Sequence, residues 1–345
     1  MALPSRSARW VSALVTGLLA LWLAYRGPTA PTPGVAAPQP ACLGTSIPLV
    51  IDHQMPYAQV SVGGRTGHFV LDFGATVSSL TPAGFDAPGA PLPVAGTADR
   101  YDHFEFFGPW GQVQLGLQPS APATSQVRQA GVLGTDFLAG HIYTLDYRAG
   151  RLYRAPAGGF CSDAQLATAG YHVLTTREYY AAQPASLTCP RAGGPGRCVN
   201  IPTVPVRIGP VQAVAQLDTG YDDGQQPYSL NINAALFDAL QQAGVKLTPR
   251  PDIALQLSTC VPGVAERIEA WQLGSGTASG LVDEQGALLP RGAGAVTLFV
   301  KRTPPVAARC GGIGTWAQPA AQLGASFVAG GALVVDPFSA RVWVR

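Results

Sequence analysis

The sequence predicts an all-β protein built from two copies of one β unit. Gly (41 residues) and Pro (31 residues) are abundant, and short runs rich in Val, Thr, Tyr and Phe recur between them, which is typical of many brief strands separated by turns. The chain of 345 residues is 47% hydrophobic and 12% charged, a composition that supports two ordinary domains with sizeable cores. An internal repeat, gapless over about twenty positions, occurs near the end of each of two similar halves.

The repeat lies near the end of each half. Residues 133–140 read LGTDFLAG and residues 323–330 read LGASFVAG, at an offset of 190 residues (324 − 134) that also relates the positions after them. We expect each copy to form a hydrophobic strand, a glycine turn and then a brief helical turn, buried by Phe137 or Phe327.

A hairpin is expected after each helical turn. Asp146 and Asp336 are duplicated at the same offset, and each follows a hydrophobic strand with an arginine five residues later. Aspartate commonly caps turns in such a context. We interpret both as structural turn residues.

Upstream of each copy, an apolar run ends in an aspartate followed by a glycine. The first is FVLDFGA at residues 69–75 and the second is VAQLDTGY at residues 214–221. A hairpin-like pair of strands leads to each aspartate. Asp72 and Asp218 alone would be ordinary turn residues, but their pairing with the repeat favours a functional role.

These ordered signatures resemble the pepsin and retropepsin clan of aspartic peptidases, whose lobes each carry a hydrophobic-Asp-Thr-Gly loop and, later, a hydrophobic-hydrophobic-Gly strand. Residues 132–134 and 322–324 occupy the second position. The resemblance covers residues from about 48 to 345 and implies a bilobal pepsin-like fold made of two retropepsin-like lobes. The implied parts are an N-terminal lobe at 42–161, an interlobe connection at 162–198 and a C-terminal lobe at 199–345.

The resemblance implies an aspartic endopeptidase whose catalytic residues are Asp72 and Asp218. Two carboxylates about 3 Å apart cannot both ionise, so they share one proton, as is known for aspartic proteases. One then acts as general base towards a water and the other as general acid. The implied enzyme is a monomer that needs no cofactor and cleaves an extended peptide or protein substrate.

The residues after each aspartate form the implied active-site loops. Gly74 and Gly220 permit the two loops to approach closely, because a side chain there would block contact. The Thr219 hydroxyl is expected to bond to the opposite loop. Phe73 stands where the family has Thr or Ser, so the reciprocal bond is missing. If the protein is an enzyme, we expect the Phe73 ring to be buried against apolar residues of the opposite lobe.

The stretch at residues 100–110 occupies the place of the family's β-hairpin flap, which closes over substrate. Tyr101 is the candidate flap aromatic. The alternative is that Phe104, Phe106 and Trp110 alternate into the core, and the two interpretations are compatible.

A second function remains open. Phe73 lacks the family's hydroxyl, and Asp222 and Asp223 follow Tyr221 where small residues are usual. If the two extra carboxylates point inward, they disturb proton sharing. The alternative is therefore a catalytically impaired pepsin-like fold that acts as a peptide- or protein-binding module.

The N-terminus predicts export. Arg6 and Arg9 precede an uncharged hydrophobic stretch at residues 10–25, so residues 1–26 are interpreted as a hydrophobic targeting helix, either a signal peptide or a membrane anchor. The Pro/Ala-rich residues 27–41 are a stiff linker. The expected location is periplasmic or extracellular, with membrane attachment if the segment is retained.

Six cysteines suit disulfides in an exported protein, although several connectivities are open. The preferred set is Cys42 with Cys161, Cys189 with Cys198, and Cys260 with Cys310. No Cys-x-x-Cys or His-Glu-x-x-His motif occurs, so no metal site is expected. A net charge of +2 without basic clusters excludes a nucleic-acid partner.

Overall fold

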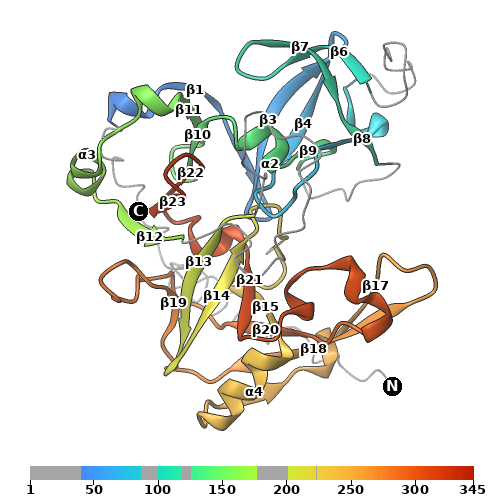
Figure 1. Cartoon of the computed structure of the whole chain (residues 1–345), viewed down its shortest axis with the longest axis vertical. Helices are drawn as coiled ribbons and strands as arrows, with labels where there is room; N and C mark the ends of the chain where they lie inside the picture. Colours follow the sequence, from blue (N-terminus) through green and yellow to red (C-terminus); the bar gives the residue numbers. More distant parts are fainter. Residues whose placement is uncertain (1–39, 87–99, 119–125, 177–200, 223) are drawn as a thin grey trace, which may run out of the picture. The chain divides into compact units, whose positions relative to one another are not determined.

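The computed structural model describes residues 40–86, 100–118, 126–176, 201–222 and 224–345. Residues Gln39–Arg345 belong to one compact unit, which Figure 1 draws as strands grouped in several sheets with few short helices. Of the described residues, 44% are strand and 16% are helix. The prediction of a mostly β protein is therefore confirmed.

The first half of the chain forms an eight-stranded sheet, the first-half sheet. Its order is β7-β6-β3-β4-β9-β5-β8, and β2 pairs with β3. The strands are β2 (Val50–Asp52), β3 (Met55–Val62), β4 (Arg65–Leu71), β5 (Ser79–Leu80), β6 (Arg100–Glu105), β7 (Pro109–Gln114), β8 (Gly116–Leu117) and β9 (Gln129–Leu133).

The second half forms a nine-stranded sheet, the second-half sheet. Its order is β16-β18-β20-β15-β21-β14-β13-β19, and β17 pairs with β18. The strands are β13 (Thr203–Ile208), β14 (Val211–Leu217), β15 (Ser229–Asn233), β16 (Leu247–Pro249), β17 (Leu255–Ser258), β18 (Ala265–Leu273), β19 (Ser279–Leu281), β20 (Thr297–Lys301) and β21 (Ala320–Leu323).

The two sheets contain the same arrangement of five strands. The order β3-β4-β9-β5-β8 in one matches β13-β14-β21-β15-β20 in the other, with parallel and antiparallel pairs in the same places. Val70 pairs with Val132, and Gln216 pairs with Gln322 in the same register. The internal repeat of the sequence is thus a repeat of structure.

A six-stranded sheet, the shared sheet, takes strands from both halves in the order β1-β11-β10-β22-β23-β12. Its centre is the antiparallel pair β10–β22, in which Tyr143 faces Val335 and Leu145 faces Leu333, so equivalent strands meet about a local two-fold axis. The strands are β1 (Thr45–Pro48), β10 (Ile142–Asp146), β11 (Arg151–Ala155), β12 (His172–Thr175), β22 (Ala332–Asp336) and β23 (Arg341–Val344).

The predicted turns of the repeat are confirmed. Asp146 accepts a hydrogen bond from the N–H of Ala149, and Asp336 accepts one from the N–H of Phe338, in the β10–β11 and β22–β23 hairpins. Each aspartate therefore caps its own turn.

Short helical elements follow the strands at the expected places. The helical turns α2 (Thr135–Leu138) and η7 (Ala325–Phe327) bury Phe137 and Phe327 to 8% exposure each, as predicted. The others are η1 (Ala41–Leu43), η2 (Pro82–Gly84), η3 (Ala157–Gly159), α3 (Asp163–Thr168), α4 (Ala234–Gln242), η4 (Pro251–Ile253), η5 (Pro305–Cys310) and η6 (Ile313–Thr315).

The segment at 162–198, expected as a connection, begins with regular structure. Helix α3 has a capping box between Ser162 and Gln165, an arrangement that satisfies free N–H groups at a helix start. Strand β12 then joins the edge of the shared sheet against β23. Residues 177–198 lie outside the described part.

The strands that lead to the two aspartates are buried on both faces. Phe69, Val70 and Leu71 at the end of β4 are at most 3% exposed. Ala215 and Leu217 at the end of β14 are at most 1% exposed. Close packing of these strand ends holds the loops after them in fixed places.

Two of the preferred disulfides are present, Cys42–Cys161 and Cys260–Cys310. The pairing Cys189–Cys198 falls outside the described residues. Disulfides persist in oxidising compartments, so the two bonds are consistent with an exported, non-cytoplasmic protein.

The expected N-terminal targeting helix also falls outside the described residues. Among those that the structure describes, no helix is long and apolar enough to cross a membrane.

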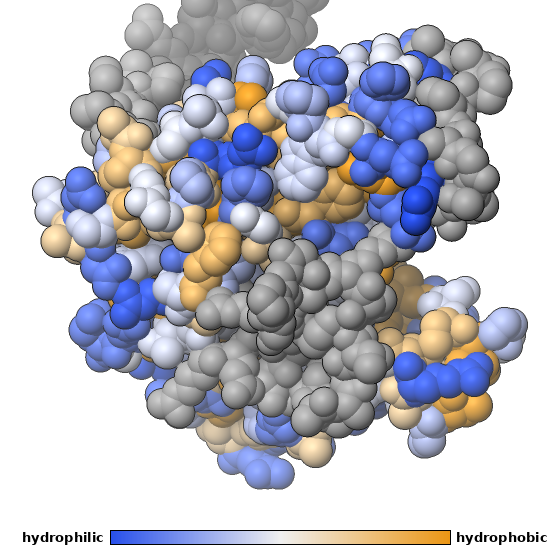
Figure 2. All heavy atoms as spheres, turned by 45° about the horizontal axis from the view of Figure 1, so that its top comes forward, coloured by the Kyte–Doolittle hydropathy of each residue, from blue (hydrophilic) through white to orange (hydrophobic). Residues whose placement is uncertain are grey.

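The exposed large hydrophobic side chains are dispersed over several elements. On the face drawn in Figure 2, hydrophilic and hydrophobic residues are interspersed. The exposed side chains are Val77, Leu117, Val214, Leu255, Leu257, Val306 and Phe338. Single exposed apolar residues are normal on a protein surface.

Candidate active site

Asp72 and Asp218 occupy equivalent positions after β4 and β14. The N–H of Asp72 donates to the carbonyl of Leu133, and the N–H of Asp218 donates to the carbonyl of Leu323, both at 2.9 Å. Each aspartate is therefore fixed by the later signature of its own half. This bond explains why the two signatures occur together in each repeat.

The two aspartates lie against each other's loops. A Cβ added to Gly74 would lie 2.3 Å from Cγ of Asp218, and one added to Gly220 would lie 2.5 Å from Cγ of Asp72. Such distances exclude any side chain at either glycine. The structure thus brings together the four predicted residues Asp72, Gly74, Asp218 and Gly220.

Thr219 joins the two loops through its hydroxyl. The Thr219 Oγ1 accepts from the N–H of Phe73 at 3.0 Å and donates to the carbonyl of Leu71 at 2.5 Å. Thr219 is fully buried, and Phe73 is 2% exposed within the main core. The Phe73 ring is buried, as the prediction requires, and the reciprocal hydroxyl bond is absent because the phenylalanine side chain has no donor.

The two carboxyl groups have different hydrogen-bond partners. Oδ1 of Asp72 accepts from the N–H of Gly74 at 2.7 Å. Oδ2 of Asp218 accepts from Nε2 of Gln322 at 2.5 Å. Oδ1 of Asp218 is buried and lies close to the Cα of Gly74.

Both carboxyls have pKa values raised above the ordinary aspartate range. Burial is the main cause for each, and for Asp218 the neighbouring Asp72 carboxylate is the second cause, which raises its pKa well above the ordinary value. Hydrogen bonds from Asp218 and from three backbone groups lower the pKa of Asp72 and so oppose the effect of its burial. Asp218 is consequently the better holder of a shared proton.

A chain of amides supports Asp218, and the sequence interpretation missed it. Oε1 of Gln322 accepts from Nδ2 of Asn231 at 2.9 Å, and Oδ1 of Asn231 accepts from the hydroxyl of Tyr221 at 3.4 Å. The signal was present in the repeat, where Gln322 occupies a position that is apolar in the first half.

The structure places Tyr101, the candidate flap aromatic, in the hydrophobic core. It lies at the start of β6, in a β6–β7 hairpin, and its side chain is 4% exposed in the main core. A register shift between Tyr101 and Phe104 turns both rings inward. The alternative interpretation is confirmed for Phe104 and Phe106, which are at most 1% exposed.

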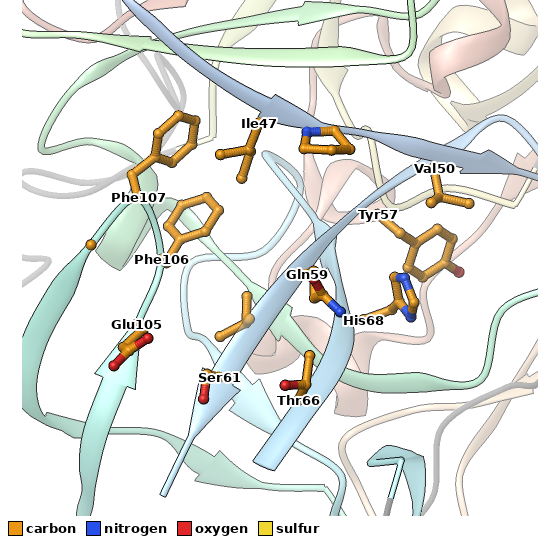
Figure 3. A pocket seen from close by; sticks show the side chains of 13 residues that line it. Ile47, Val50, Tyr57, Gln59, Ser61, Thr66, His68, Glu105, Phe106 and Phe107 are labelled. Atoms are coloured by element: carbon orange, nitrogen blue, oxygen red, sulfur yellow. The ribbon is translucent and has the colours of Figure 1, made fainter. Parts of the chain in front are cut away.

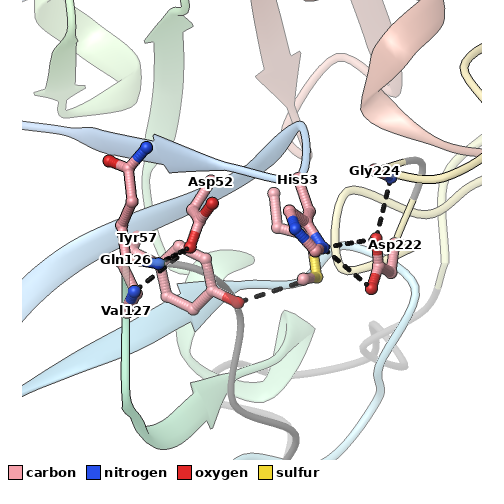
Figure 4. A network of polar contacts seen from close by, with 8 residues as sticks. Asp52, His53, Tyr57, Gln126, Val127, Asp222 and Gly224 are labelled. Carbon is pink, nitrogen blue, oxygen red and sulfur yellow. Dashed lines mark hydrogen bonds and ion pairs between the residues drawn. The ribbon is translucent and has the colours of Figure 1, made fainter. Parts of the chain in front are cut away.

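Asp222 is directed away from the dyad, towards the first half. Nδ1 of His53, in the β2–β3 turn, lies 3.1 Å from Oδ1 of Asp222, which also accepts from the N–H of Gly224. Figure 4 shows this contact between the two halves. Asp222 therefore does not crowd the two aspartates, and Asp223 lies outside the described residues.

A pocket of about 540 Å³ lies elsewhere, between β1, the β3–β4 hairpin and the tip of β6–β7. Figure 3 shows Phe106 and Phe107 on one side of it and Tyr57 and His68 on the other. Neither aspartate lines it. It is separate from the candidate site.

The chemistry available at the candidate site is that of two carboxyls. In the part of the chain that the structure describes, no three His, Cys, Asp or Glu side chains are grouped as metal ligands would be. Neither the family models nor the curated proteins compared with the chain match it.

Proposed function

We propose that this protein is an aspartic endopeptidase with a bilobal pepsin-like fold, in which Asp72 and Asp218 are the catalytic pair. The observation that carries the proposal is the crossed contact of the two loops, in which each carboxyl lies against the glycine of the other. Equivalent strands of a duplicated unit deliver the two residues. Aspartates that only cap turns do not require two loops to approach each other this closely.

The different surroundings of the carboxyls assign their roles. Asp218, whose pKa is raised further, holds the shared proton, and Asp72, with its backbone donors, is the carboxylate. Asp72 takes a proton from a water, whose oxygen attacks the peptide carbonyl while Asp218 gives its proton to the carbonyl oxygen. The proton gained by Asp72 then passes to the leaving nitrogen as the C–N bond breaks, and a hydroxyl of the intermediate returns its proton to Asp218 as the product carboxyl forms.

The proposed substrate is an extended peptide or protein segment, held by backbone hydrogen bonds and by pockets on alternate faces. The proposed enzyme is a monomer in a periplasmic or extracellular location, attached to the membrane if residues 1–26 are retained. The two disulfides are compatible with this location.

A second candidate function is a peptide- or protein-binding module that keeps the cleft and has lost catalysis. It is favoured by Phe73, which cannot return the hydroxyl bond that Thr219 makes. The orientation of Asp222 towards His53 weakens the other argument for it, which rested on Asp222 and Asp223.

Digestion of a broad peptide library by the full chain, from acid to neutral pH, tests the proposal. We expect cleavage by the wild type and by Asp252→Asn, an exposed carboxylate paired with Arg250, and none by Asp72→Asn. A folded, disulfide-bonded wild type that cleaves nothing, or an active Asp72→Asn, refutes the peptidase and leaves the binding module.

A further inference from the structure

A row of three amide side chains crosses the second-half sheet beside Asp218. The neighbouring strands β14, β21 and β15 place these residues in direct register. Side chains in register on neighbouring strands lie on the same face of a sheet. The row consists of Gln216, Gln322 and Asn231.

The first-half sheet has no such row. Strands β4, β9 and β5 are in the corresponding register, and the residues there are Val70, Val132 and Ser79. The hydroxyl of Ser79 donates to Gln118. The two halves are otherwise duplicated, but the row beside the aspartate consists of amides in the second half and is mostly apolar in the first half.

The hydrogen bonds along the row run in one direction, towards Asp218. An amide nitrogen only donates and an amide oxygen only accepts. Because Nδ2 of Asn231 donates to Oε1 of Gln322, the nitrogen of Gln322 must face Asp218. The hydroxyl of Tyr221 completes the chain by donating to Oδ1 of Asn231.

A donor at Oδ2 of Asp218 restricts where a proton can reside. Oδ2 already accepts the amide hydrogen of Gln322, which disfavours a proton on the same oxygen. The proton is therefore favoured on Oδ1, which is buried beside Gly74, the residue whose N–H bonds to Asp72.

We propose that Gln322, oriented by Asn231 and Tyr221, is a positioning residue that directs the shared proton to Oδ1 of Asp218 and stabilises the charged form of that carboxyl through Oδ2. The inference rests on the proposed function in taking Asp72 and Asp218 as the reacting pair. Its direct consequence, the titration of Asp218, is measured without a substrate.

The charged groups around Asp218 are few. From the first half, Asp72 faces it. From β14, β21 and β15, the row supplies only neutral amides. On its own loop, Tyr221 bonds to Asn231, and Asp222 is paired with His53. Gln322 is the neutral side chain that donates a hydrogen bond to the Asp218 carboxyl. Its replacement by an apolar residue therefore removes this bond without changing the charge of the site.

The test is carboxyl titration by NMR of the full chain labelled with ¹³C at aspartate Cγ. The Asp218 resonance is assigned by its loss in Asp218→Asn. We expect Gln322→Leu to raise the Asp218 midpoint by about one pH unit, because the lost hydrogen bond favours the charged form. Asn231→Leu should raise it by less. Val132→Thr, at the equivalent place in the first half, is the matched control and should leave it unchanged.

Each result decides the proposal. A raised midpoint in Gln322→Leu, with an unchanged control, supports it even if no peptide is cleaved. An unchanged midpoint in Gln322→Leu overturns the proposal. This holds even if the wild type is an active peptidase whose activity is abolished by Asp218→Asn. If Gln322→Leu does not fold, Gln322→Met, which keeps the chain length without the amide, is read by the same criterion.

Discussion

The hydroxyl of Thr219 bridges two backbone groups on either side of Asp72, since it accepts from the N–H of Phe73 and donates to the carbonyl of Leu71. One side chain of the second half therefore fixes the backbone on both sides of the aspartate of the first half. The reciprocal bond from position 73 does not exist, so this bridge between the two loops depends on Thr219.

Thr219→Val is expected to weaken both folding and catalysis. The change keeps the shape and removes both bonds, leaving a buried N–H and a buried carbonyl unsatisfied, each at a cost of about 1–3 kcal/mol. Thr219→Ser keeps the hydroxyl and should retain most of both properties. Urea unfolding and kcat/KM are the measurements, and a Thr219→Val protein equal to the wild type in both would contradict the bridge.

Phe73→Thr is expected to lower stability by about 2–5 kcal/mol, the usual cost of a large-to-small change in a core. The Phe73 ring is 2% exposed, so a threonine leaves a cavity there. Activity should gain little from the added hydroxyl. Denaturant unfolding checks the first expectation, and an unchanged unfolding midpoint would show that the ring contributes nothing to the core.

Gly74→Ala is expected to separate the carboxyls. The new Cβ would lie 2.3 Å from Cγ of Asp218, so the loops must move apart, and a displacement of about 1 Å can cost about 100-fold in rate. Gly158→Ala is the control, because no atom lies within 4 Å of its Cβ position. If kcat/KM of Gly74→Ala matched that of the control, the crossed contact would not matter for catalysis.

The raised pKa of Asp218 makes stability depend on pH. The folded state binds this proton more tightly than the unfolded state does. In the unfolded state the pKa of aspartate has its ordinary value of 3.8. The contribution is therefore fully present below that value and is lost as pH rises through the folded pKa. Asp218→Asn should accordingly become more stable relative to the wild type from acid to neutral pH.

The control for this pH dependence has the opposite sign. Arg250 lowers the pKa of Asp252, so the stability that Asp252 contributes appears as pH rises. Urea midpoints of Asp218→Asn, Asp252→Asn and the wild type across the pH range provide the comparison. Parallel curves for wild type and Asp218→Asn would mean that Asp218 titrates normally.

The repeat in the sequence predicted the helical turns and the hairpins, because a constant offset reveals equivalent positions. The meeting of Asp72 with Asp218 was implied by the resemblance to aspartic peptidases. The repeat could not predict the shared sheet, since pairing of β10 with β22 joins residues far apart in the chain and no local pattern encodes it. The contacts of Gln322 could not be predicted either, because its hydrogen bond with Asn231 depends on the register between two strands that are far apart in the sequence.

The orientation of the Tyr101 side chain also could not be predicted from the sequence. Its place after the first aspartate suggested a flap, but the irregularity at His103, whose φ is 52°, reverses the alternation and turns the ring into the core. A single residue in the left-handed region is hard to anticipate without the structure.

The most direct test of the dyad is a double-mutant comparison of peptide cleavage by Asp72→Asn, Asp218→Asn and the protein carrying both changes. Residues that act as one unit are not additive. The account predicts that each single change abolishes cleavage and that the double change is no worse. Independent partial losses that add in the double variant, or full activity in either single variant, would contradict it.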